Sequence, residues 1–156
     1  MVNIMTTITA KIQIYVSSDQ SKNLIATINA YRNACNWLSK HVFETKILKQ
    51  AKLNDLYYKQ LRSQFGLKSQ MAQSVMKTVI ARYKSAKSNG YEWSLIEFKL
   101  PEYDLVWNRD YSLTENQFSV NTLDGRIKLN YERKSMKKYF NGTWKFGTAK
   151  LVHKFQ

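Results

Sequence analysis

The order of the hydrophobic periods along the chain restricts its fold more than any other feature. Residues 7–16 alternate strictly between apolar and polar side chains, which is typical of a half-buried strand. From residue 18 to Gly90 the apolar residues recur every three or four positions, and beyond Gly90 strand-like segments return. A lone strand cannot satisfy its own backbone groups, so residues 7–16 need a partner from beyond residue 90. The pattern therefore predicts an α+β protein in which helices are inserted after the first strand of a β module.

Three helices are predicted in the insertion. Ser17 and Gln20 fit a capping box that opens the first helix, whose apolar stripe runs from Leu24 to Val42. Asn54 is predicted to cap a second helix that ends at Phe65-Gly66. Ser69 is predicted to cap the third, over residues 69–89. Its predicted inward residues are Ala72, Val75, Met76, Val79, Ile80 and Tyr83.

The remainder of the chain has the turn signals and β-branched or aromatic content of a β protein. Asp124-Gly125 and Asn141-Gly142 are predicted hairpin turns, and Pro101 indicates an edge or a bend. We expect one β module formed by residues 5–17 and 91–156 and a helical domain over residues 18–90. The predicted strands beyond Gly90 are 93–99, 105–109, 117–121, 126–131 and 143–154.

The charge of the chain is strongly one-sided. Its 25 Lys and Arg against 11 Asp and Glu give a formal net charge of +14, concentrated in residues 1–90. A field of this size favours a polyanionic partner, either nucleic acid or an anionic membrane surface. No segment reaches the length of apolar sequence that spans a bilayer, and the start of the chain does not resemble a signal peptide. We therefore expect a cytoplasmic protein without a membrane segment.

Catalytic constellations are not evident in the sequence. The acids are scattered, and the single cysteine, Cys35, excludes an internal disulfide and a Cys-pair zinc site. His41 and His153 stand far apart without Cys, Asp or Glu at ligand spacing, so His41 is expected to face phosphate or solvent. The sequence predicts neither a metal, nor a cofactor, nor an enzymatic activity for this chain.

Basic, amide and aromatic side chains are interleaved in the helical segment. The third helix follows a short Gly-containing turn and carries Gln and Lys but no acid. A polar, basic helix after such a turn is typical of proteins that place this helix in a nucleic-acid groove. An ordinary helical hairpin with a solvated face is the alternative. Tyr31 lies on the apolar stripe and is expected in the core. Candidate nucleic-acid-binding residues are Arg32, Asn36 and Lys40 on the first helix, and Gln70, Gln73, Lys77, Lys84 and Lys87 on the third.

Several blocks of the sequence occur in the order found in one known family. The chain resembles the N-terminal part of TnpB, the transposon-encoded, RNA-guided DNA endonuclease family also called OrfB-type transposases and related to miniature CRISPR effectors. The blocks are Lys11-Ile-Gln-Ile-Tyr15, Ala30-Tyr-Arg-Asn-Ala-Cys-Asn-Trp-Leu38, Leu61-Arg-Ser-Gln-Phe-Gly-Leu-Lys-Ser-Gln-Met-Ala72, Arg82-Tyr-Lys-Ser-Ala-Lys87, Gly125-Arg-Ile-Lys-Leu-Asn-Tyr131 and Gly147-Thr-Ala-Lys-Leu-Val152.

This resemblance implies a wedge-type β-barrel interrupted by a helical recognition domain, which together hold a guide RNA and read a short motif in double-stranded DNA. It implies motif reading by Lys68, Ser69, Gln70 and Lys77. Sequence readout of the target itself would belong to RNA–DNA pairing.

The family's RuvC-like nuclease and zinc ribbon would follow Gln156, so the resemblance implies a truncated chain with an incomplete barrel and no nuclease. An incomplete barrel predicts self-association through an open edge near residues 143–154. Two alternatives remain, a helix-turn-helix accessory or regulatory DNA-binding protein without RNA, and a non-functional transposase remnant.

Overall fold

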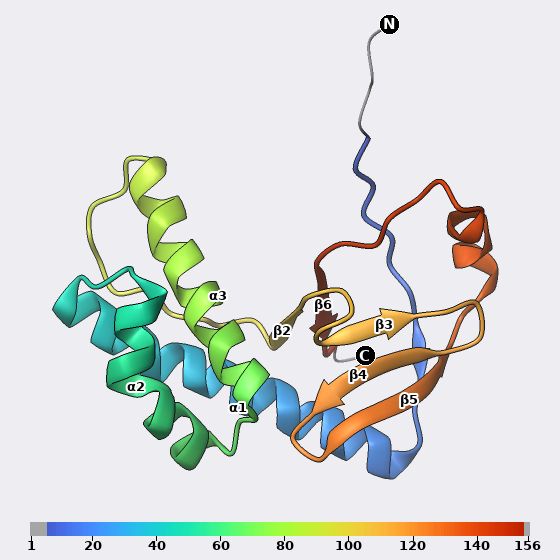
Figure 1. The fold of residues 1–156 in the computed structure, drawn as a ribbon, viewed down its shortest axis with the longest axis horizontal. Helices are drawn as coiled ribbons and strands as arrows, with labels where there is room; N and C mark the ends of the chain where they lie inside the picture. The colour runs from blue at the N-terminus through green and yellow to red at the C-terminus, as the bar shows by residue number, and fades with distance from the viewer. Residues whose placement is uncertain (1–5, 155–156) are drawn as a thin grey trace, which may run out of the picture.

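The computed structural model describes residues 6–154, which form a mixed α+β fold with an open antiparallel sheet (Figure 1). Residue 5 and residues 155–156 of the predicted β module lie outside the described residues. The elements in chain order are β1 (Ile14–Tyr15), α1 (Ser18–Thr45), α2 (Gln50–Phe65), α3 (Ser69–Ser88), β2 (Glu102–Leu105), β3 (Tyr111–Leu113), β4 (Phe118–Thr122), β5 (Gly125–Tyr131), the 3₁₀ helix η1 (Lys134–Phe140) and β6 (Ala149–Val152).

Helix α1 begins where the sequence predicts. Ser17 Oγ accepts a hydrogen bond from the Gln20 backbone N–H at 3.2 Å, and Gln20 Oε1 accepts from the Ser17 N–H at 2.9 Å. This reciprocal capping box satisfies two N–H groups at the start of the helix. The predicted stripe from Leu24 to Val42 is buried, which confirms the helical period.

Helix α2 begins earlier than predicted. It starts at Gln50, so Asn54 lies inside the helix and the prediction that Asn54 caps it is wrong. The Asn54 side chain instead accepts a hydrogen bond from Gln73 on α3, which occupies the oxygen that a cap would need. The predicted end at Gly66 is confirmed, because Gly66 has a φ of 65° in the left-handed region that glycine adopts without steric cost.

Helix α3 starts at Ser69, but Ser69 is its first helical residue rather than its cap. Lys68 occupies the cap position and makes no side-chain capping bond, so the predicted Ser69 cap is wrong. Leu67 is only 2% exposed, and its insertion into the core leaves Lys68 as the last residue before the helix. All six residues predicted to face inward on α3 are buried.

The first strand pairs with a strand from beyond residue 90, as predicted. Ile14 faces Tyr131 and Tyr15 faces Asn130 in antiparallel register, and the Glu132 N–H donates to the Gln13 carbonyl at 2.8 Å. The strand is shorter than the predicted 7–16, because the partner strand β5 ends at Tyr131 where the chain turns into η1. The sheet order is β1-β5-β4-β3, and β2 pairs with β6 in a separate two-stranded sheet.

The predicted hairpin at Asp124-Gly125 is confirmed, and the strands on either side of it, β4 and β5, match the predicted 117–121 and 126–131 closely. Thr122 pairs with Gly125, so Leu123 and Asp124 form the loop, and Gly125 has a φ of 102°. Tyr111–Leu113 (β3) and η1 were not predicted from the sequence.

Three predicted β features differ in the structure. Residues 93–99 form no strand, because side chains of α1 and α3 bond their backbone groups. The predicted strand 105–109 is replaced by β2 and a turn, which the buried carboxylate of Asp110 closes by accepting from the Val106 N–H at 2.8 Å. Within 143–154 only Ala149–Val152 is a strand, so Asn141-Gly142 joins η1 to irregular chain and is not a hairpin turn.

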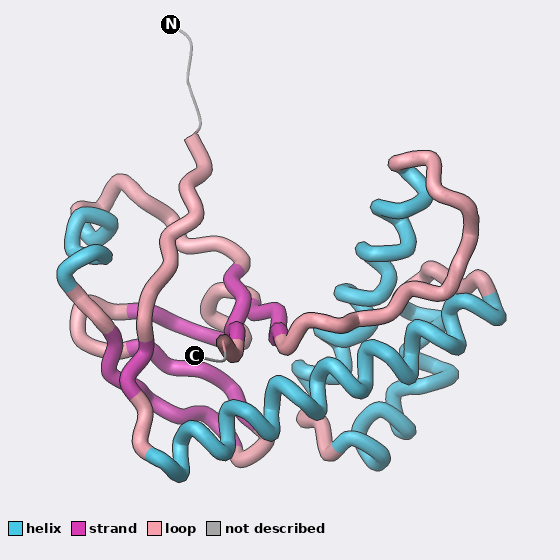
Figure 2. The backbone as a smooth tube through the Cα atoms, turned by 180° about the vertical axis from the view of Figure 1, so that it is seen from behind, coloured by secondary structure: helices cyan, strands magenta, loops and turns pink. Residues whose placement is uncertain are grey.

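Helix α1 connects the sheet to the other helices. Figure 2 shows α1 running from the four-stranded sheet at its N-terminal end to α2 and α3 at its C-terminal end. Near the sheet, Asn23 Nδ2 donates to Thr122 Oγ1 at 3.0 Å and the Leu123 N–H donates to Thr27 Oγ1 at 3.1 Å. These bonds attach the sheet to the N-terminal part of α1, and α3 is bonded to the same helix further along, through Tyr31 and Ser39.

Candidate nucleic-acid interface

Three polar residues with a spacing of seven lie on the solvent side of α3. We call Gln70, Lys77 and Lys84 the α3 ridge; all three are exposed. Seven residues are close to two helical turns, so the three side chains project from one side at intervals of about 10 Å. Lys68 precedes the ridge at the helix start, Lys87 follows it, and both are exposed. No acidic side chain occurs in α3.

The opposite side of α3 is fixed by a polar network. The Tyr31 hydroxyl lies 3.0 Å from Ser74 Oγ and 2.7 Å from Thr78 Oγ1. Thr78 in turn donates to Asp104 Oδ2 at 2.7 Å, which joins α3 to β2. Burial raises the pKa of Tyr31 well above its usual value, so its hydroxyl stays protonated. Because these bonds set the rotation of α3, the ridge is held outward.

The turn before α3 is short and internally bonded. Gly66 closes α2, Leu67 enters the core, and Arg62 Nε donates to the Leu67 carbonyl at 3.3 Å. Ser69 is exposed beside Tyr58, and its hydrogen bond is the largest influence that lowers the pKa of the Tyr58 hydroxyl. Lys68 and Ser69 therefore lie at the surface at the N-terminal end of the ridge.

Gln73 does not belong to the exposed interface. Its Nε2 donates to Asn54 Oδ1 at 2.6 Å, and its Oε1 accepts from Gln50 Nε2 at 2.8 Å. Both ends of the amide are used between α3 and α2, and the residue is half-buried. The hypothesis that Gln73 contacts nucleic acid is not supported by this arrangement, because α2 packs over the same strip of α3.

The α1 candidates have mixed surroundings. Asn36 is half-buried and bonds both backbone groups of Phe98, accepting from the N–H at 2.7 Å and donating to the carbonyl at 3.1 Å. Its amide is thereby occupied in holding residues 93–99. Arg32 donates to the Lys99 carbonyl at 3.2 Å, whereas Lys40 is exposed. The structure therefore leaves Lys40 as the α1 candidate that extends into solvent.

His41 packs among aromatic rings and does not point freely into solvent. Its ring centroid lies 4.5 Å from that of Trp37 and 4.6 Å from that of Tyr57. The side chain is half-buried. His41 is therefore less solvated than expected, because α2 brings Tyr57 against the helix face that carries it, and the expectation that it faces phosphate stays a prediction. Tyr31 is buried, as expected from its place on the apolar stripe.

A second basic surface was missed in the sequence. Arg133, Lys134, Lys137, Lys138 and Lys145 are exposed around η1, and we call them the η1 cluster. No acid occurs between residues 133 and 145. Glu132 accepts from the Lys134 N–H at 2.8 Å and from Ser135 Oγ at 2.6 Å, which anchors the start of η1. The absence of acids from this run of the sequence was a signal that could have identified it.

Within residues 6–154 no three His, Cys, Asp or Glu side chains are grouped so as to hold a metal ion. In the same span, no helix combines the length and apolar character needed to cross a membrane. No protein-family model, curated protein or solved structure matches this chain.

Proposed function

We propose that this chain binds nucleic acid through the α3 ridge, as the recognition and wedge portion of a TnpB-like, RNA-guided transposon protein. The observation that carries the proposal is the ridge itself. It is a helix face of Gln70, Lys77 and Lys84 without acids, held outward by the partly buried Tyr31–Thr78–Asp104 network. This face is exposed to solvent, is positively charged at its two lysines, and carries one side-chain amide.

The lysines and the glutamine of the ridge suit different parts of a duplex. Lysine ammonium groups neutralise phosphates and carry no sequence information, whereas a glutamine amide can pair with the edge of adenine in the major groove. In this proposal α2, the turn over Gly66, Leu67 and Lys68, and α3 would act as a helix-turn-helix, with α3 as the recognition helix. Gln70 would then read the base and Lys77 and Lys84 would fix the register.

The resemblance to TnpB adds RNA to the proposed partners. The open sheet β1-β5-β4-β3 and the β2–β6 pair would form the wedge-type barrel, and the η1 cluster on it would hold the backbone of a guide RNA. RNA–DNA pairing would then select the target, while the α3 ridge reads the flanking duplex.

A duplex-DNA regulator that uses no RNA is the second candidate. It is favoured by the short turn and the ridge, which would contact a duplex without any residue of the four-stranded sheet. Nucleic acid recovered with the purified chain separates the two, because a guide-binding protein retains RNA and a regulator does not.

Binding titrations at two salt concentrations test the shared claim. Lys77→Ala and Lys84→Ala should each weaken duplex binding across all sequences and reduce the slope of log affinity against log salt by about 0.9. Lys22→Ala is the matched control, because Lys22 is an exposed lysine at the distant start of α1. If both ridge variants bind like the parent at both salt concentrations, the ridge is only a solvated helix face.

A further inference from the structure

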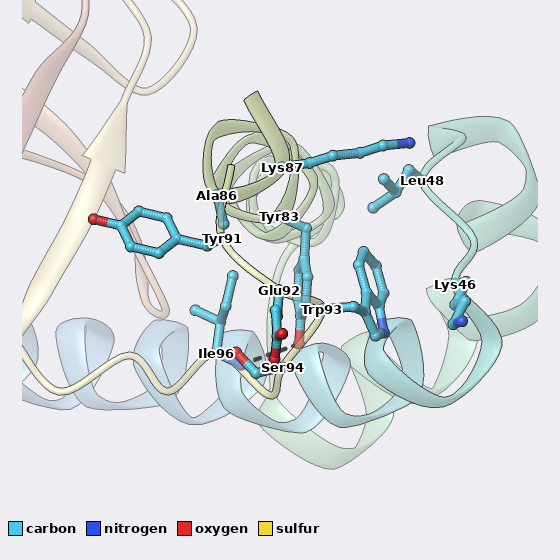
Figure 3. Close-up of a pocket in the computed structure, with 10 residues that line it drawn as sticks. All are labelled: Lys46, Leu48, Tyr83, Ala86, Lys87, Tyr91, Glu92, Trp93, Ser94 and Ile96. Carbon is cyan, nitrogen blue, oxygen red and sulfur yellow. Dashed lines mark hydrogen bonds between the residues drawn. The ribbon is translucent and has the colours of Figure 1, made fainter. Parts of the chain in front are cut away.

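A surface pocket of about 290 Å³ lies beyond the C-terminal end of the ridge. It is bounded by α3, by the residues just after α1, and by the chain that follows Gly90. Figure 3 shows Trp93 between Tyr83 and Lys46, with Lys87 extending from α3 toward Leu48. The volume is at the lower limit of pockets that bind small molecules, so it suits a single compact ring system. Its lining residues include Lys46, Leu48, Tyr83, Lys87, Trp93 and Ser94.

The Trp93 ring is held in place before any ligand arrives. Its Nε1 donates to the Phe43 carbonyl at 3.0 Å, and its ring centroid lies 4.9 Å from that of Tyr83. Tyr83 is itself fixed, since its hydroxyl donates to the Ser39 carbonyl at 2.9 Å and accepts from the Ile96 N–H at 3.2 Å. Trp93 nevertheless remains half-exposed, so part of its ring is available to a flat partner.

The charges beside this ring suit a phosphate. Lys46, just after α1, and Lys87 on α3 are exposed cations that line the pocket, and together with the one acid of the lining, Glu92, they leave it with a net positive charge. Neither makes an ion pair among the described residues, where the salt bridges involve only Arg109 and Lys150. A flat apolar ring next to free ammonium groups is the combination that proteins use for unpaired nucleotides, where the base stacks and the cations bind the backbone.

We propose that this pocket binds one unpaired nucleotide, with its base against Trp93 and Leu48 and its phosphate between Lys46 and Lys87. The inference rests on the proposed nucleic-acid function and names a second contact of that function. Lys87 lies three residues after Lys84, so a strand leaving the ridge reaches the pocket within one helical turn. The unpaired nucleotide belongs either to RNA or to the separated strand of a DNA duplex.

Cross-linking of the unaltered protein is the direct test. Single-stranded RNA and single-stranded DNA, each with one 5-iodouracil, are irradiated with the protein, and the attached residue is mapped by mass spectrometry. Attachment at Trp93 is expected, and the more efficient of the two oligonucleotides identifies the source. Attachment that maps only to other parts of the chain would overturn the pocket assignment.

Charge variants distinguish binding at the pocket from binding at the α3 ridge. Lys46→Gln should reduce the salt slope for single strands by about 0.7 and leave binding of blunt duplex unchanged, whereas Lys84→Gln should weaken duplex binding. Trp93→Ala should weaken single-strand binding by roughly 5- to 150-fold, with melting curves to show that it folds. If Lys84→Gln acts on duplex while Lys46→Gln leaves single strands unaffected, the pocket proposal alone fails. If the parent binds neither duplex nor single strand, both proposals fail.

Discussion

The side-chain amide of Gln73 donates to Asn54 Oδ1 at 2.6 Å, joining α3 to α2. Gln73→Ala would leave Asn54 and Gln50 without this partner at a half-buried site, so we expect a loss of about 1–3 kcal/mol in the free energy of unfolding. The expected affinity for nucleic acid, corrected for the folded fraction, is unchanged. Urea titration and duplex binding measure the two quantities.

Gln70 is the matched control, because it is the same residue type on the same helix but exposed. Gln70→Ala should change stability by no more than about 0.5 kcal/mol and reduce discrimination between duplex sequences by about 1–3 kcal/mol. The reverse outcome, with Gln70→Ala unstable and Gln73→Ala defective in recognition, would contradict the placement of both residues.

Asn36 should act as a structural residue. Asn36→Ala removes both hydrogen bonds to the Phe98 backbone, so hydrogen exchange at the Phe98 amide should accelerate and residues 93–99 should loosen from α1. Asn33→Ala tests the same change at an exposed position of the same helix and should leave this exchange rate unaltered. Equal protection at Phe98 in both variants would show that the Asn36 amide is not what holds this segment.

Gly66 should be sensitive to substitution because of its backbone conformation. Its φ of 65° lies in the left-handed region, and a Cβ there meets no atom within 4 Å, so the cost of Gly66→Ala is backbone strain of about 1 kcal/mol. Gly147 also has open space around a built Cβ but lacks a left-handed φ, so Gly147→Ala should be nearly neutral. Thermal melting of both variants checks this, and equal shifts in Tm would argue against strain at the turn.

The anchor of η1 should be pH-dependent. The Ser135 hydroxyl, followed by the backbone N–H groups, lowers the pKa of Glu132 below its usual value. A lowered pKa in the folded state contributes stability above the unfolded pKa and loses it as pH falls through the folded pKa. The difference in Tm between the parent and Glu132→Gln should therefore be largest near neutral pH and should disappear in acid. Ser135→Ala should reproduce the same trend, and a difference that stays constant with pH would exclude this role for the carboxylate.

Local sequence determined the helices well because their signals are short in range. The capping box of Ser17 and Gln20, the left-handed Gly66 and the stripe of α3 depend on residues within one or two turns, and each was identified correctly. The β4–β5 hairpin was identified for the same reason, since the turn residues Asp124 and Gly125 lie next to each other where β4 ends and β5 begins. The mixed α+β class and the pairing of the first strand with one beyond residue 90 followed from the order of the periods.

Only the tertiary structure decided which polar side chains remain exposed and able to contact a partner. Gln70 and Gln73 look equivalent in the sequence, yet α2 covers Gln73 and leaves Gln70 exposed. Residues 93–99 have the composition of a strand, but the polar groups of Asn36, Ser39 and Tyr83 satisfy their backbone without a neighbouring strand. These hydrogen-bond partners are separated by between 13 and 62 positions along the chain. A local sequence pattern carries no information about partners so far apart. The sequence therefore defined the helices and the β4–β5 hairpin, and the packing of α2 and of residues 93–99 against α1 and α3 defined the surface that they present.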